Sequence, residues 1–164
     1  MTDFQRDMIS GMKKSILFIV LAVMALTADA SKIFRGNSTY SSDCEYTYQD
    51  GKVYWGNSTY SADVVFTFSD NKIYRRNSTY SADIINCYYN GKMYRGNSTY
   101  SADVIWTFSG DKIYWGNSTY SSDCIMTVTN NHVYRGNSTY SSDIILTYEG
   151  YIPLPVLVKC ALNM

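Results

Sequence analysis

Carboxylates recur along this chain at a fixed spacing of 20 residues. Six aspartates share this spacing: Asp43, Asp63, Asp83, Asp103, Asp123 and Asp143. Carboxylates gathered in a ring could bind a divalent cation. An aspartate at the end of a loop more often accepts hydrogen bonds from nearby backbone N–H groups. We interpret the six aspartates as loop residues and predict no metal site.

Other residues that could carry catalysis are few. The chain has one histidine, His132, and four cysteines, Cys44, Cys87, Cys124 and Cys160. A single histidine excludes a multi-histidine centre, and three of the cysteines, Cys44, Cys87 and Cys124, occupy positions that hold Val, Ile or Thr in other copies of the repeat described below. We therefore expect small core cysteines and no disulfide framework. No serine, cysteine or carboxylate has an evident catalytic partner nearby, so we predict neither an enzyme nor a bound cofactor.

One further periodic position holds either arginine or tryptophan. The residues there are Arg35, Trp55, Arg75, Arg95, Trp115 and Arg135. With Trp106, they form the candidate ligand or interface residues of the chain. Tryptophan and arginine suit a membrane–water interface, where amphipathic aromatic side chains settle. The same aromatic side chains could instead serve as stacking platforms for carbohydrate.

The balance of charged residues limits which binding partners the chain is expected to have. There are 14 basic and 14 acidic residues, which argues against a basic polyanion-binding domain and hence against a nucleic-acid partner. A hydrophobic content of 46% is too high for a disordered chain, and 164 residues can bury a sizeable core.

The elements that position these residues come from one sequence unit that is repeated six times in tandem. The segment Asn-Ser-Thr-Tyr-Ser begins at Asn37, Asn57, Asn77, Asn97, Asn117 and Asn137. Each copy contains a short strand pattern, such as 72–75, and a longer one, such as 64–68, joined by turn pairs such as Asp50-Gly51. Such pairs supply the positive φ angles of two-residue hairpin turns. The Asn-Ser-Thr triplets fit the N-glycosylation sequon, but we interpret them as turn residues.

Residues 31–150 therefore form an all-β meander of twelve short strands, which could close into a ring or stack as a β-hairpin solenoid. A solenoid needs atypical terminal repeats, whereas the first and last copies here resemble the interior ones. The array begins with a short strand, 32–35, and ends with a long one, 144–148. Each of these two end strands lacks a neighbour on one side, and pairing them with each other would supply it. We predict a closed six-fold ring, or shallow barrel, of antiparallel strands.

Alternation along the strands predicts which face points inward. One face carries nearly the same residue in every copy: Val or Ile as at Val65, Thr as at Thr67 and Tyr as at Tyr74. The other face varies and includes the Arg/Trp position. Because copies around a common axis must fit one another, we expect the uniform face inward and the Arg/Trp position outward. Glu45 departs from the uniform face and is expected to reach the rim or line a wet channel.

The repeat resembles the β-flower proteins. The resemblance rests on the unit Lys-Ile-Tyr-Arg-Gly-Asn-Ser-Thr-Tyr-Ser-Ser-Asp-Ile-Ile-x-Thr-Tyr, which occurs in six near-identical copies over residues 32–148. The resemblance implies a bacterial fold in which short hairpins radiate from a shallow, symmetric barrel, with no known enzymatic activity. That barrel is similar in outline to the Tubby C-terminal domain, which suggests by analogy contact with membrane lipid.

The N-terminal 30 residues have the pattern of a signal peptide. Lys13 and Lys14 precede an apolar run over 16–26, which is too short for an ordinary membrane span. Ala28 and Ala30 then suit a cleavage site before Ser31. Met12 makes a better start than Met1, and an uncleaved N-terminal anchor is the alternative. We expect export to the periplasm, cell surface or medium of a bacterium.

Residues 151–164 form an apolar tail outside the repeats. Pro153 and Pro155 argue against a helix before Val156, after which a short helix or strand is possible. Twelve strands enclose more space than their side chains alone can fill, so the tail could plug the ring axis. The alternative is an interface with another chain. Together these observations predict an exported, non-catalytic repeat module that contacts envelope lipid, or alternatively a carbohydrate-binding module.

Overall fold

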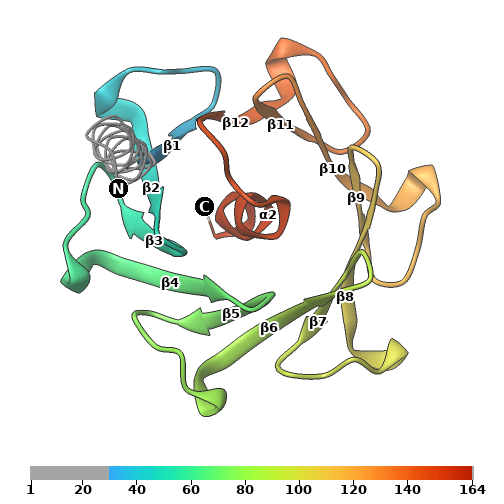
Figure 1. Ribbon diagram of the computed structural model, residues 1–164. Coiled ribbons are helices and arrows are strands. Elements are labelled where there is room, and N and C mark those ends of the chain that lie inside the picture. Colours follow the sequence, from blue (N-terminus) through green and yellow to red (C-terminus); the bar gives the residue numbers. More distant parts are fainter. Residues whose placement is uncertain (1–29, 164) are drawn as a thin grey trace, which may run out of the picture.

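The computed structural model describes residues 30–163, which form a closed antiparallel barrel around one helix (Figure 1). Each strand pairs with its neighbours in sequence, and β1 pairs with β12. The elements are β1 (Ser31–Arg35), β2 (Cys44–Gln49), β3 (Lys52–Trp55), β4 (Val64–Ser69), β5 (Lys72–Arg75), β6 (Ile84–Tyr89), β7 (Lys92–Arg95), β8 (Val104–Ser109), β9 (Lys112–Trp115), β10 (Cys124–Thr129), β11 (His132–Arg135), β12 (Ile144–Glu149) and α2 (Leu154–Leu162).

Pairing of the first and last strands closes the ring, as the phase of the repeats predicts. Lys32 lies opposite Glu149, and Arg35 lies opposite Leu146. The solenoid alternative is therefore wrong. The hairpin turns adopt the left-handed backbone that their residues favour, with φ of 50° at Asp50 and 76° at Gly51. Both the turns and the closure thus follow from sequence features that the repeats share.

The loop of each repeat folds over the outer face of the sheet. Thr47 Oγ1 donates a hydrogen bond of 2.6 Å to the carbonyl oxygen of Gly56, where the loop leaves β3. Four other repeats make the same bond, from Thr67, Thr107, Thr127 and Thr147. The neighbouring outer position holds a tyrosine, such as Tyr54 or Tyr74, which is buried although it lies outside the barrel. The loops therefore complete a second, local packing layer around the ring.

Every long strand contains a β-bulge at the same position. Val53 lies opposite Phe66 and Tyr54 lies opposite Val64, so Val65 is the extra residue. The equivalent residues are Glu45, Ile85, Ile105, Ile125 and Ile145. A bulge interrupts the alternation of side chains between the two faces and sharpens the local bend of the strand. As a result, residues on either side of it no longer follow one simple in–out pattern.

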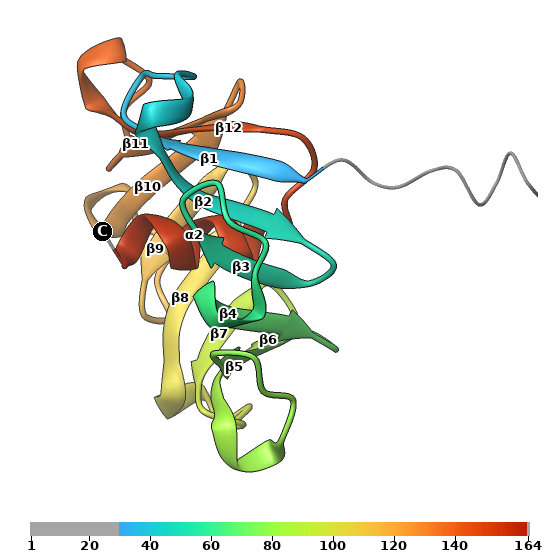
Figure 2. The ribbon, with the colours of Figure 1, turned by 90° about the vertical axis from the view of Figure 1, so that its left-hand side faces the viewer.

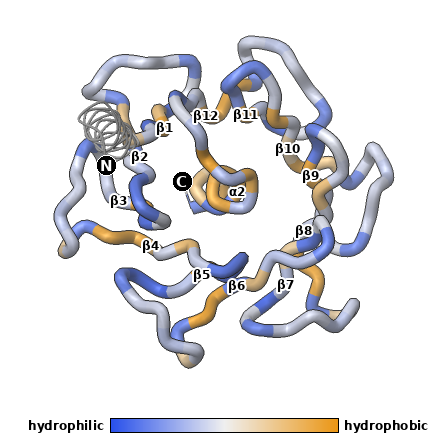
Figure 3. The backbone as a smooth tube through the Cα atoms, in the orientation of Figure 1, coloured by the Kyte–Doolittle hydropathy of each residue, from blue (hydrophilic) through white to orange (hydrophobic). Residues whose placement is uncertain are grey.

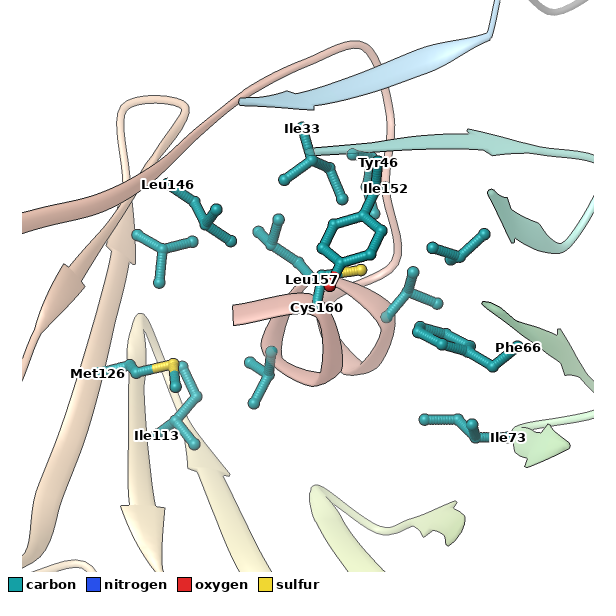
Figure 4. Close-up of a cluster of buried hydrophobic side chains, with 14 of the residues drawn as sticks. Ile33, Tyr46, Phe66, Ile73, Ile113, Met126, Leu146, Ile152, Leu157 and Cys160 are labelled. Carbon is teal, nitrogen blue, oxygen red and sulfur yellow. The ribbon is translucent and has the colours of Figure 1, made fainter. Parts of the chain in front are cut away.

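The observed faces correct the expectation for two of the three uniform positions. The Thr and Tyr positions lie on the outer face beneath the loops, and the variable positions point inward (Figure 4). Val65 and its four isoleucine equivalents do pack against the core, as expected, because the bulge turns them inward. The uniformity has a local cause. Five of the six Thr positions hold a threonine that donates to the first carbonyl of the loop that begins the next repeat around the ring, and those loops are nearly identical.

Two inward rows of side chains surround α2. The first is aliphatic and almost inaccessible to solvent: Ile33, Val53, Ile73, Met93, Ile113 and Val133. The second is the variable row: Tyr46, Phe66, Asn86, Trp106, Met126 and Leu146. Figure 3 shows the apolar stretches of the strands together with the largely apolar helix inside the ring. The core therefore sits between the ring and the helix.

The C-terminal tail enters the ring and becomes its central helix, α2 (Figure 1). Four of its residues, Val156, Leu157, Val158 and Cys160, are at most 1% exposed. The axial position predicted for the tail is confirmed. The helix begins two residues earlier than expected, at Leu154, and includes Pro155 in its first turn. Proline is compatible with that place because the first N–H groups of a helix have no partner within it.

The predicted signal peptide, cleavage site and start at Met12 lie outside the described residues. Over residues 30–163, no helix is long and apolar enough to cross a membrane.

Leu157→Ala tests how much the axial helix stabilises the barrel. Leu157 is 1% exposed in the core, and truncating such a leucine leaves a cavity, so we expect the free energy of unfolding to fall by about 2–5 kcal/mol. Leu162→Ala is the matched control, because that side chain is 40% exposed in the same helix and should change stability by much less. Urea denaturation measures both. Equal, small effects would contradict a structural role for the helix.

Arg76 occupies a left-handed position that glycine holds in the other five repeats. Its φ is 50°, close to the 59° of Gly96. Because a side chain is disfavoured there, we expect Arg76→Gly to raise the free energy of unfolding by about 1 kcal/mol. The reverse change, Gly96→Ala, meets no atom within 4 Å and should lower it by a similar amount through the backbone alone. Thermal or urea unfolding that shows no opposite pair of shifts would contradict this account.

Candidate ligand-binding mouth

The six Arg/Trp positions line one opening of the barrel. Trp55 lies opposite Tyr46 and Arg75 opposite Phe66, so this row shares the inward face of the variable row. We call the six residues the Arg/Trp rim: Arg35, Trp55, Arg75, Arg95, Trp115 and Arg135. The rim lies at the end of the barrel where α2 finishes, opposite the β2–β3 turn (Figure 2). We call this opening the C-terminal mouth.

The outward placement expected for the Arg/Trp position is therefore wrong. All six side chains are exposed because the strands end there, and the row lies beyond the end of the core. Trp55 and Trp115 are 54% and 65% exposed, which leaves much of each indole available. Trp106 differs from them. It is only 7% exposed in the variable row and belongs to the core, so the structure does not present it as a surface residue.

The rim carries an excess of positive charge. Arg35 pairs with Glu45, at 2.5 Å between a guanidinium nitrogen and a carboxylate oxygen. Glu45 thus reaches the rim, which was one of the two expectations for it. No other ion pair occurs within residues 30–163, so Arg75, Arg95 and Arg135 are not neutralised there by a described carboxylate. An exposed pair of this kind adds little stability, and the mouth remains a cationic surface.

Aromatic packing fixes one side of the rim. The ring of Trp55 stacks on Tyr46, with centroids 5.0 Å apart and planes 26° apart. Tyr46 is fully buried, and its hydroxyl has no hydrogen-bond partner among residues 30–163. Burial, followed by the nearby Cys160 thiol, raises the pKa of Tyr46 to about 12. A buried phenol thus holds the exposed indole of Trp55 in place.

A cavity of about 610 Å³ opens at the C-terminal mouth beside α2. Its apolar walls are Ile125, Met126, Ile144, Ile145, Ala161 and Leu162. Arg35 and Arg135 also line it. The structure thus brings together two of the predicted rim residues and apolar residues that sequence analysis did not select. A C-terminal apolar tail directed at the ring axis was the only available signal for Ala161 and Leu162.

The periodic aspartates have a structural role in the loops. In each repeat a serine hydroxyl donates to the aspartate five residues later, as from Ser58 to Asp63 at 2.5 Å. The backbone N–H of Tyr60 donates in turn to Ser58 Oγ at 3.1 Å. The Asn-Ser-Thr-Tyr-Ser segment is thus an ordered turn, in agreement with our interpretation, although the aspartate accepts from a side chain. No group of three or more potential metal ligands occurs within residues 30–163.

Six tyrosines on the loops are the largest exposed aromatic set. They are Tyr40, Tyr60, Tyr80, Tyr100, Tyr120 and Tyr140, each about three-quarters exposed. These tyrosines lie in the Asn-Ser-Thr-Tyr-Ser turns, and their place in that polar segment is the sequence signal for their exposure.

Tyr46→Phe tests the buried phenol. Since the folded pKa is about 12 and the ordinary value is 10.0, the unfolded chain ionises first at alkaline pH, so the free energy of unfolding falls as the pH rises from 10 toward 12. Removing a buried hydroxyl that has no partner should leave stability at neutral pH unchanged or raised, and should reduce the alkaline loss. Tyr40→Phe, at an exposed ring, is the matched control. Identical pH–stability profiles of Tyr46→Phe and native protein would contradict the assignment.

Comparison with known proteins agrees with the observed architecture. A family model described as "6-fold beta flower protein" matches residues 33–157, which is well over half of the chain. Searches of curated proteins and of solved structures gave no significant match. The β-flower family is not known as an enzyme family. The closed ring of six hairpin repeats and the matching family model together show that this chain belongs to the six-fold β-flower family.

Proposed function

We propose that the protein is an exported, non-catalytic module that binds anionic lipid at the cell envelope through its C-terminal mouth. The observation that carries this proposal is the Arg/Trp rim, in which three arginines without a described acidic partner stand beside two exposed tryptophans. Arginine is attracted to an anionic bilayer surface, and tryptophan is enriched at the depth of the head groups. The N-terminal sequence pattern supports export.

The walls of the mouth favour lipid over carbohydrate. A sugar ring needs hydrogen-bond donors and acceptors around a stacking face, whereas the cavity walls are formed mainly by Ile, Met, Ala and Leu side chains. Carbohydrate binding remains the competing hypothesis, because Trp55 and Trp115 each expose an indole. Both hypotheses use the same rim, and they differ in the ligand that the rim would bind.

The double variant Arg75→Gln/Arg95→Gln tests lipid binding. Each arginine near an anionic surface contributes about 1 kcal/mol, so removing two should weaken binding to mixed phosphatidylglycerol/phosphatidylcholine vesicles by roughly 30-fold. Native protein should bind pure phosphatidylcholine vesicles poorly, and binding to the anionic vesicles should fall as salt is added. Vesicle co-sedimentation measures these effects.

Lys72→Gln/Lys112→Gln is the matched control. It removes the same charge from the outer face of the barrel, where these lysines pair with outer-face residues, and should bind anionic vesicles like native protein. All variants share the same N-terminal segment, so any binding through that segment is common to them. Equal losses in the two double variants would reject the rim as the lipid site. Binding on a glycan array without binding to vesicles would favour the carbohydrate hypothesis instead.

A further inference from the structure

The cavity beside α2 lies where one small side chain of the helix meets the ring. Ala161 faces β10 and β12, and Leu162 continues the same wall to the surface. Leu162 is 40% exposed, which is unusual for a leucine in an otherwise buried helix. An apolar wall therefore runs from the solvent into the space between α2 and the strands. A larger residue at 161 would fill that space.

The polar groups of the cavity lie on the β1 and β11 side of the mouth. Arg35 and Arg135 belong to these strands, and both are exposed. The charge of Arg35 is balanced by Glu45, whereas Arg135 has no ion pair within residues 30–163. The site thus offers one uncompensated cation above an apolar wall. Its volume of about 610 Å³ falls within the range of small-molecule sites in proteins.

We propose that this cavity binds one acyl chain that carries an anionic head group, with the chain against Ile125, Ile145 and Ala161 and the head group on Arg135. The charge and the apolar wall together match an anionic amphiphile and match neither a neutral sugar nor a soluble anion. This inference rests on the proposed function for its lipid source. It assigns one acyl chain to a defined place, whereas the rim as a whole binds the surface of the bilayer.

Soluble fatty acids test the cavity without a membrane. Octanoate, decanoate and dodecanoate, titrated calorimetrically below their critical micelle concentrations, should bind native protein at one site. Affinity should rise by roughly tenfold or more for each two added methylenes until the cavity is full, because each buried methylene strengthens binding about fourfold. No binding of any of the three would overturn the proposal.

Two variants test the acyl-chain contact and the head-group contact separately. Ala161→Phe should fill the cavity and weaken decanoate binding by at least about tenfold. Arg135→Gln changes an exposed residue and should weaken it by about fivefold, while the dependence on chain length is retained. Lys112→Gln, which removes one positive charge from the outer face of the barrel and outside the cavity lining, is the matched control and should bind decanoate like native protein. Equal effects of Arg135→Gln and Lys112→Gln would overturn the assignment even if Ala161→Phe failed to fold.

Vesicle binding by Ala161→Phe shows whether the bound acyl chain belongs to a free fatty acid or to a bilayer lipid. Native-like vesicle binding with lost decanoate binding identifies free fatty acid as the ligand, and loss of both identifies the chain of a bilayer lipid. The two proposals also fail separately. Decanoate binding without vesicle binding would remove the proposed membrane contact, and vesicle binding without decanoate binding would remove the cavity assignment.

Discussion

The structure depends on the fit between a twelve-strand ring and one short helix. A closed barrel of about eight strands can be filled by its own side chains, but a ring of twelve encloses more space. Helix α2 occupies that space, and its buried residues Val156, Leu157, Val158 and Cys160 belong to one core cluster with side chains from every repeat. Burial of the inner rows and the position of the mouth both depend on this packing interaction.

A six-fold ring and a single helix have different symmetries, and the misfit is confined to the inner face. The outer face repeats almost without change because its threonines donate to loops of nearly the same sequence. The variable row, which ranges from Asn86 to Trp106, faces the single helix inside the ring. Three buried polar atoms without a hydrogen bond, on Tyr46, Asn86 and Trp106, all belong to this row. The cavity at Ala161 is a further place where the helix does not fill the ring.

Much of the fold could be predicted from the sequence, because it depends on local signals that recur. The turn residues, the spacing of 20 and the complementary end strands specify the hairpins and the closure. Alternation placed Thr67 and Tyr74 on one face correctly, but the uniformity of that face indicated the wrong side of the sheet, and the bulge separates Val65 from that face. The Arg/Trp position was recognised by residue type but placed on the wrong face. The cavity depends on the position of α2, which no repeat encodes.

Closure also limits how this gene could change in length. Near-identical tandem copies are prone to gain or lose a unit by unequal recombination, and an open repeat array could tolerate such events because its ends are free. Here the number of copies sets the circumference, while the diameter of α2 is fixed by helix geometry. A seventh copy would separate the wall from the helix, and a ring of only five copies would leave too little room for the helix. Expansion and contraction of the array would therefore be removed by selection for folding, even when the reading frame is preserved.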